Sequence, residues 1–300
     1  MLTSFLAFLS AFTAGQECQA LVDRGAQAYQ NRQFSGAAKD FTQALDLCPA
    51  SERKALLLNL GQAQLMARQF TAALKTLHRL LTVDPRNSAA LKLAADAYYF
   101  SGDDRAAERS LLDAIQVDPR DHEAMYKLGR MYYQQSRYQE ARDQFLKAIR
   151  FEAGSYRAYD NLGLCYEALN EPEKAMSSFL KAIELVHNDH PDYDWAYANL
   201  ANFLINRGEY RRAFDLAVEA ARRNPHSPRN FYLGAKALSK LDQWETSVRW
   251  LKRSIELDPE YPEPHYLLGK VYSRQGKTQE ARQEFDIFKE LRGKTPSHPR

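Results

Sequence analysis

Apolar and small residues recur along this chain with a period of about 34 residues. Within each period they fall at the fourth, seventh, eighth and eleventh places, which share one face of a helix. After a short polar gap a second stripe follows, with a small residue at the twentieth place and a large apolar residue near the twenty-fourth. Each period therefore predicts two antiparallel helices joined by a turn. The periods begin at residues 18, 54, 88, 122, 156, 194, 228 and 262.

Two places in every period carry a small residue. The eighth places hold Gly25, Gly61, Ala95, Gly129, Gly163, Ala201, Ala235 and Gly269. The twentieth places hold Ala37, Ala73, Ala107, Ala141, Ala175, Ala213, Ser247 and Ala281. A fixed period of this length is typical of a solenoid, in which each unit buries its apolar face against its neighbours.

The pattern resembles the tetratricopeptide repeat. The period that begins at residue 122 shows it most clearly, with Met125, Leu128, Gly129, Tyr132, Tyr138, Ala141, Phe145 and Ala148. Helix stops are supplied by Pro49, Pro85, Pro119, Pro225 and Pro259. The resemblance implies an all-α fold, a right-handed α-solenoid of about eight tandem helix–turn–helix repeats over residues 18–292, followed by a short basic tail at 293–300.

Small and turn-forming residues predict how each repeat packs. Gly163 and Ala175 are expected to let two helix backbones approach closely, with large residues on either side. Glycines at the fifteenth place are expected in the turns, at Gly102, Gly208 and Gly276. Pro172 suits the first turn of a helix.

Two steps between repeats are longer than 34 residues. The first repeat is followed by two extra residues near Glu52 and Arg53, and the fifth by four extra residues between Val186 and Tyr193. Four residues make about one helical turn, so the second helix of the fifth repeat is expected to run one turn longer.

The N-terminal segment is apolar and lacks charged side chains from Met1 to Ala14. It is too short to span a bilayer, and small residues follow it as at a signal-peptidase site. We therefore expect residues 1–15 to be a signal peptide and the protein to be exported, periplasmic or secreted. The alternative is an apolar helix that caps the first repeat of a cytoplasmic protein, since no Lys or Arg precedes the segment.

Charge and motifs exclude several functions. The net charge is +3, from 41 Lys and Arg and 38 Asp and Glu, which is too small an excess to favour nucleic-acid binding. The sequence shows no phosphate-binding loop, zinc-binding helix or nucleophile elbow. His187 and His190 flank Asp189, a cluster that favours a solvated loop over a metal site because one short segment would supply every ligand. We expect no enzyme activity, no cofactor and no metal.

The cysteines predict one bridge. Cys18 opens the first helix of the first repeat and Cys48 closes its second, so in an antiparallel hairpin the two lie close enough for a disulfide. Such a bridge favours an oxidising compartment, although two cysteines can also fall near each other without bonding. Cys165 lies beside a buried stripe and is expected to be a small core residue.

The resemblance also implies where a ligand binds. In tetratricopeptide proteins the second, fifth, ninth and twelfth places of the first helices line a concave groove. The candidate partner-binding residues there, with the adjoining thirteenth place, are Tyr99, Tyr126, Arg130, Tyr133, Arg157, Tyr232, Lys236, Tyr266, Lys270 and Arg274. Tyr and Arg are common interface anchors, but the repeat consensus itself favours Tyr at two of these places, so a structural role stays open.

Two specialised family sites are absent. The chaperone-binding clamp needs Asn where the third repeat has Asp96 and where the fourth has Lys127. The asparagine ladder of sugar-transferase superhelices is interrupted, so Asn161 and Asn199 are expected to bond neighbouring helices instead.

Three functional hypotheses remain. The first is a non-enzymatic scaffold that binds an extended peptide or a partner domain in its groove, where Tyr126, Arg130 and Tyr133 contribute most and Lys236 and Lys270 attract an acidic segment. The second is a structural element that self-associates through its C-terminal end. The third is the regulatory arm of a larger extracytoplasmic complex. At the C-terminal end, Phe288 is expected to fold inward and leave a polar cap, whereas self-association requires a partner to cover it.

Overall fold

The chain is helical throughout the part that the structure describes. This computed structural model describes the backbone of residues 2–187 and 189–294 and the side chains of residues 15–187 and 189–293. The helices are α1 (Leu2–Gln30), α2 (Phe34–Leu47), η1 (Ala50–Glu52), α3 (Arg53–Met66), α4 (Phe70–Val83), α5 (Ser88–Ser101), α6 (Asp104–Val117), α7 (His122–Gln134), α8 (Tyr138–Phe151), α9 (Tyr156–Ala168), α10 (Pro172–Val186), α11 (Trp195–Asn206), α12 (Tyr210–Arg223), α13 (Pro228–Lys240), α14 (Trp244–Leu257), α15 (Pro262–Arg274) and α16 (Thr278–Lys294).

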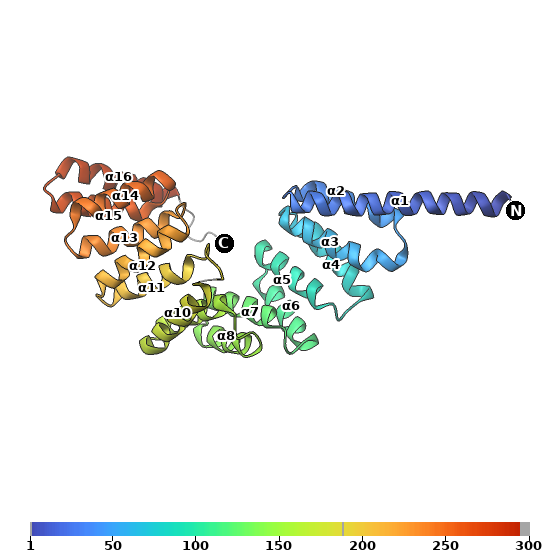
Figure 1. Ribbon diagram of the computed structural model, residues 1–300, viewed down its shortest axis with the longest axis horizontal. Coiled ribbons are helices and arrows are strands. Elements are labelled where there is room, and N and C mark those ends of the chain that lie inside the picture. Colours follow the sequence, from blue (N-terminus) through green and yellow to red (C-terminus); the bar gives the residue numbers. More distant parts are fainter. Residues whose placement is uncertain (1, 188, 295–300) are drawn as a thin grey trace. The chain divides into compact units, whose positions relative to one another are not determined.

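These elements form the expected helix–turn–helix repeats, so the all-α solenoid is confirmed. From α3 onward, every odd-numbered helix begins within one residue of the predicted start of a repeat. Figure 1 shows the helices following one another as stacked pairs. The chain divides into two compact units, Met1–Met131 and Tyr132–Arg300, with the division inside α7.

Large residues of the second helices fill the space left by small residues of the first. A methyl group added to Gly163 would lie 2.6 Å from the ring of Phe179. The nearest atoms to this position all belong to Phe179, so the aromatic ring, and not the backbone beside Ala175, occupies the space at the glycine. The same arrangement pairs Gly25 with Phe41, Gly61 with Leu77 and Gly269 with Phe285.

The turn within each repeat has a left-handed residue at its fifteenth place. Gly102, Gly208 and Gly276 have φ values of 88°, 82° and 75°, as expected for turn glycines. The other five repeats place non-glycine residues in this conformation, namely Arg32, Arg68, Ser136, Asn170 and Asp242. The turn is therefore common to all repeats, and glycine is not required for it. Pro172 is the first residue of α10, as the sequence predicts.

The longer steps form short connections. Of the two extra residues of the first step, Glu52 ends the 3₁₀ turn η1 and Arg53 begins α3. The four extra residues of the second do not extend α10, which has 15 residues against 14 in α8. The prediction of an added helical turn is therefore wrong. Residues 187–194 instead form a connection between α10 and α11, the inserted loop, of which residue 188 is not described.

The two ends of the chain are described in part. The backbone of α1 begins at Leu2, so the segment expected to be a signal peptide continues into the first helix of the first repeat (Figure 1). The side chains of residues 1–14 lie outside the described residues, as do residues 295–300 of the basic tail. Among the helices that the structure describes, none combines the length and the apolar character that crossing a membrane requires.

Candidate functional site

Two lysines of the first unit, Lys92 and Lys127, are held in ion pairs with nearby carboxylates. Lys92 Nζ lies 3.0 Å from Asp121 Oδ2 and 2.6 Å from Glu123 Oε2. Burial lowers the pKa of Lys92, but its hydrogen bonds to the two carboxylates outweigh burial and raise the pKa above its usual value. Lys127 Nζ lies 2.8 Å from Asp96 Oδ2. These lysines stabilise the contact between repeats and offer little free charge to a ligand.

The predicted aromatic residues of the first unit lie at or near its surface. Tyr99 is half-buried and its ring lies 5.5 Å from that of the exposed Phe100. Tyr126 is half-buried, and the exposed guanidinium of Arg130 lies 5.9 Å from its ring centroid. This distance allows a cation–π contact, which orients Arg130 on the helix surface.

In the second unit, Tyr133 lies on α7 and Arg157 on α9. Tyr133 is half-buried, with its ring 5.4 Å from that of Tyr138, and burial raises the pKa of its hydroxyl to about 12. Arg157 is exposed and lies 5.6 Å from the ring of Tyr156.

Four cations line up on α13 and α15 in the second unit. Lys236 and Lys240 are one turn apart on α13, and Lys270 and Arg274 occupy the equivalent places on α15. We call these four residues the cation row. None of them forms an ion pair with a residue that the structure describes.

Local electrostatics disfavours the charged form of one member of the cation row, Lys236. Burial lowers the pKa of Lys236, the neighbouring charge of Lys240 lowers it further, and Glu167 opposes both effects. A lysine whose charged form is disfavoured in this way gains from an approaching anion. Lys270 Nζ lies 5.5 Å from the ring of Tyr266, which is 44% exposed.

A hollow of about 220 Å³ lies at the end of the cation row. We call it the basic hollow, and its lining residues are Ser239, Lys240, Asp242, Trp244, Leu267, Lys270, Val271 and Arg274. Of these, Lys270 and Arg274 were predicted as groove residues. Trp244 was not predicted, because the groove places lie on first helices and Trp244 is the first residue of the second helix α14.

A buried polar network lies elsewhere in the second unit. Asp160, 2% exposed, accepts hydrogen bonds from Tyr193 Oη and Asn199 Nδ2, each at 2.9 Å. Asn199 Oδ1 in turn accepts one from Arg229 Nη2 at 2.8 Å. Asn199 therefore joins neighbouring helices, as expected. Asn161 does not, because its amide donates to the backbone oxygen of Arg157 in its own helix.

Burial has a large effect on the charge states in this network. It raises the pKa of Asp160 to about 6, although the hydrogen bonds from Asn199 and Tyr193 and the charge of Arg229 act in the opposite direction. It also lowers the pKa of Arg229.

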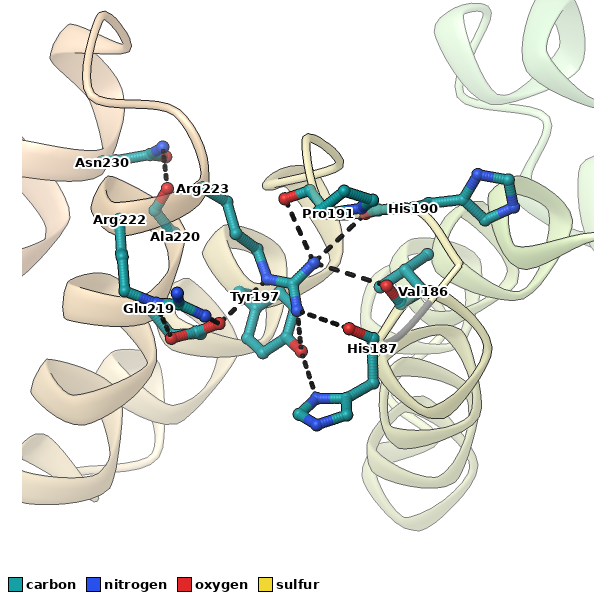
Figure 2. Close-up of polar contacts among 10 residues, drawn as sticks. All are labelled: Val186, His187, His190, Pro191, Tyr197, Glu219, Ala220, Arg222, Arg223 and Asn230. Carbon is teal, nitrogen blue, oxygen red and sulfur yellow. Dashed lines mark hydrogen bonds and ion pairs between the residues drawn. The ribbon is translucent and has the colours of Figure 1, made fainter.

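The inserted loop is tied to α12 by a buried arginine that the sequence analysis did not single out (Figure 2). The side chain of Arg223 is 3% exposed. Its guanidinium donates to the backbone oxygens of Val186, His187, His190 and Pro191 and to Tyr197 Oη.

Two further contacts complete the environment of Arg223. Its Nε lies 3.0 Å from Glu219 Oε1, and its Cζ lies 4.4 Å from the centroid of the Tyr197 ring. The guanidinium is thus surrounded by acceptors and by an aromatic face, which compensates for the loss of water around a buried charge.

The two histidines of the inserted loop, His187 and His190, contact tyrosine side chains. His187 Nδ1 lies 3.3 Å from Tyr197 Oη, and the ring of His190 lies 4.3 Å from that of Tyr156. Among the described side chains, the group with metal-ligand spacing is Cys18, Cys48 and Glu52. Its two sulfur atoms are bonded to each other, so they are not free to bind a metal in this structure.

The disulfide joins the two ends of the first repeat. Cys18 in α1 and Cys48 after α2 have Cα atoms 5.0 Å apart, within the usual range for a bridge. Cys165 is fully buried and unbonded, and burial raises the pKa of its thiol to about 12. Such a thiol is a poor nucleophile at neutral pH.

Family models match most of the chain. Models described as "Tetratricopeptide repeat" match residues 22–88, 58–104, 92–158, 156–185 and 195–224. A model described as "TPR repeat" matches residues 235–276. No curated protein matches the sequence.

Several solved structures have the same fold. A tetratricopeptide repeat protein from Parabacteroides merdae is 20% identical, with a TM-score of 0.65 over 86% of this chain and 99% of that one. Pseudomonas aeruginosa pilF is 22% identical, with a TM-score of 0.61 over 71% and 96%. A chain of the APC/C hetero-tetramer Cut9–Hcn1 is 13% identical, with a TM-score of 0.67 over 87% of this chain and half of that one. At these identities the likeness concerns the fold alone.

Proposed function

The chain belongs to the tetratricopeptide repeat family, whose members are protein-interaction scaffolds, and we propose that its second unit binds an extended acidic segment of a partner protein. The proposed site is the groove face of α13 and α15, with Tyr232, Lys236, Tyr266, Lys270 and Arg274 as its main contacts.

The observation that carries this proposal is the contrast between two ion-paired lysines of the first unit and the cation row. Lys92 and Lys127 are neutralised by carboxylates of adjacent repeats. The cation row has no ion pair among the described residues, and burial together with the charge of Lys240 lowers the pKa of Lys236. Complementary charge raises both the rate and the selectivity of binding, so a ligand rich in Asp and Glu fits this face.

Aromatic residues beside the cation row supply apolar contact area. Tyr232 is half-buried, with its ring 5.6 Å from that of Tyr261, and Tyr266 is the more exposed of the two groove tyrosines. Rigid aromatic side chains of this kind lose little conformational entropy on binding and commonly carry much of its free energy. Backbone and apolar groups of the segment would pack on them while its carboxylates approach the lysines.

A defined probe tests the proposal. A short fluorescent peptide of alternating Glu and Ala is titrated with the full chain, and its Kd is compared with that of the same peptide carrying Lys in place of Glu. We expect only the acidic peptide to bind, with the charge-reversal variant Lys236→Glu/Lys270→Glu weakening it about tenfold or more. Added salt should weaken the binding to the wild-type chain.

Lys252→Glu is the matched control. Lys252 is exposed on the second helix α14, and Lys252→Glu changes the net charge by as much as either single groove variant, Lys236→Glu or Lys270→Glu. If Lys252→Glu weakens the peptide as much as either groove variant, the attraction comes from net charge and the groove assignment is wrong.

The contribution of Arg130 and Tyr133 on α7 to partner binding remains a prediction from the sequence. Arg130→Ala or Tyr133→Ala should weaken binding of a natural partner by at least about 1 kcal/mol, with the helical melt almost unchanged. Wild-type affinity in these variants would contradict a contribution of α7 and would leave α13 and α15 as the proposed contact surface.

We also propose that the protein is exported. The apolar N-terminal segment and the bridged Cys18 and Cys48 both support an oxidising compartment. Cell fractionation with N-terminal sequencing of the mature chain tests this, since recovery of the intact N-terminus from the cytoplasm alone would contradict it.

A further inference from the structure

The basic hollow differs chemically from the rest of the groove. It lies where α13 ends, α14 begins and α15 completes its last two turns, three helices that follow one another in Figure 1. Lys240, Lys270 and Arg274 contribute three positive charges to its lining, and Asp242 contributes one negative charge. The charged side chains of the lining therefore sum to +2.

Several surface cations elsewhere in this chain are neutralised by a nearby carboxylate. Elsewhere, surface Lys and Arg residues commonly pair with a carboxylate three places away, as do Arg137 with Glu140, Lys174 with Glu171, Lys181 with Glu184, Arg212 with Glu209, Arg222 with Glu219 and Arg253 with Glu256. Within the part of the chain that the structure describes, the three cations of the basic hollow have no such partner. Their charge is available to a ligand.

The walls of the basic hollow also have an apolar side. Leu267 and Val271 of α15 line it together with Trp244, the first residue of α14. The Cζ of Arg274 lies 5.6 Å from the centroid of the Trp244 ring, so the aromatic face restrains the guanidinium. A side chain with an apolar stem and an anionic head would contact both kinds of wall.

We propose that the basic hollow binds a phosphorylated side chain of the acidic segment, an inference that rests on the proposed function. A phosphoryl group on Ser, Thr or Tyr carries a charge of about −1.5 to −2, which matches the +2 of the lining, whereas one Asp or Glu leaves an uncompensated cation. Its three terminal oxygens accept hydrogen bonds from a forked guanidinium and from two ammonium groups at once. The hollow, about 220 Å³, is several times larger than the roughly 30 Å³ of one water molecule.

Three fluorescent peptides test this inference. They share one sequence of alternating Glu and Ala and differ at one central position, which is Ser, Glu or phosphoserine. The measurements use the full chain at near-physiological ionic strength. We expect the phosphoserine peptide to bind about tenfold more tightly than the Glu peptide, because a phosphoryl group can accept charge-assisted hydrogen bonds from all three cations of the basic hollow, whereas a single carboxylate cannot contact all three.

Two sets of variants locate the effect. Lys270→Gln/Arg274→Gln should abolish the difference between the phosphoserine and Glu peptides, because both residues line the basic hollow. Lys236→Gln should weaken all three peptides by similar factors and preserve the difference, because Lys236 does not line the hollow. Circular dichroism melts of each variant check that the fold is intact, as expected for the exposed Lys270 and Arg274.

The outcomes separate this inference from the proposed function. Equal affinity for the phosphoserine and Glu peptides overturns the phosphoryl site and leaves acidic-segment binding in place. Failure of all three peptides to bind overturns both. Inorganic phosphate that binds as tightly as the phosphoserine peptide assigns the hollow to a free ion and overturns its role in holding a segment.

Discussion

Asp160 shows how a single carboxyl group makes folding sensitive to pH. It is buried in the second unit and accepts hydrogen bonds from a residue of the inserted loop, Tyr193, and from a residue of the next repeat, Asn199. Burial penalises its charged form more than these neighbours favour it, so its pKa is raised to about 6. The protonated form is correspondingly favoured in the folded chain.

The stability of the second unit should therefore fall as pH rises from 4 to 6. The pKa of Asp160 is about 3.9 in the unfolded chain, so the group stabilises the fold below pH 4 and loses this contribution as pH rises through about 6. The difference amounts to a loss on the order of 3 kcal/mol. Urea denaturation at several pH values checks this, because Asp160→Asn should remove that part of the pH dependence.

The comparison of wild type with Asp160→Asn isolates the effect from other carboxylates. Asp40 and Asp121, for example, have lowered pKa values and change stability in the opposite direction. Asp192→Asn, at an exposed carboxylate of the inserted loop, is the control and should leave the pH dependence unchanged. A wild-type curve parallel to that of Asp160→Asn would show that the carboxyl group is already ionised at pH 4.

Matched pairs of residues set the spacing of helices within each repeat. Glycine faces Phe at Gly163 and Phe179, whereas the third repeat has Ala95 and Leu111 at the same two places. In these two repeats the smaller residue at one place accompanies the larger residue at the other, which favours dense packing. The repeat period identifies the small residues at the eighth places. Which large side chain fills the space beside each of them depends on how the two helices of the repeat pack.

Gly163→Ala should destabilise the second unit. The added methyl group would lie 2.6 Å from the Phe179 ring, so the ring must move, at a cost of about 1–3 kcal/mol. The double variant Gly163→Ala/Phe179→Leu should recover part of that loss because it reproduces the Ala–Leu pair of the third repeat. A double-mutant cycle in urea measures the coupling, and strictly additive effects would contradict direct packing.

The inserted loop shows where prediction from sequence ends. Its four extra residues suggest one more turn of helix, but α10 ends at Val186 and the carbonyl oxygens that follow accept hydrogen bonds from Arg223. Arg223 lies more than 30 residues from the loop residues that it contacts, and its polar side chain suggests a solvated position. Only the packing of α12 beside the loop makes it a buried donor, and no local pattern encodes that contact.

Arg223→Ala should loosen the inserted loop and destabilise the second unit. The substitution removes a buried guanidinium that donates to four backbone carbonyl oxygens, which should cost about 1–3 kcal/mol. Hydrogen exchange of the loop and of the start of α11 should become faster. Arg222→Ala is the matched control, since Arg222 pairs with the same Glu219 but its side chain is 72% exposed, and its loop should exchange as in wild type.

At the scale of the whole molecule, the repeat pattern predicts the fold well and the binding surface only in outline. Every repeat buries its stripes against sequence neighbours, so periodicity alone specifies the solenoid. The groove places of Lys92 and Lys236 are equally recognisable in the sequence. Lys92 is ion-paired and Lys236 is not, because Asp121, just before the following repeat, and Glu123 within it lie close to Lys92. Composition does not reveal this contact.

The redox state of the whole chain gives a direct test of the disulfide. Native protein isolated from an oxidising compartment should show one thiol, that of Cys165, and only after denaturation because Cys165 is buried. Reduction should lower the stability of the first repeat by about 3 kcal/mol, since the bridge closes a loop of 30 residues. Three thiols in unreduced, denatured protein would contradict the bridge.

Self-association of the whole molecule depends on the C-terminal end, where Phe288 replaces a small residue of the repeat pattern. Phe288 is half-buried, with its ring 5.1 Å from that of Tyr266 and 5.6 Å from the Cζ of Arg292. Its ring therefore packs on α15 of the same chain, and the neighbouring Lys289 and Glu290 are exposed. We expect the wild-type chain to sediment as a monomer at micromolar concentration, and Phe288→Ala to remain monomeric while it destabilises the last repeat by about 1 kcal/mol. A wild-type dimer that Phe288→Ala converts to monomer would instead establish the C-terminal end as an assembly surface.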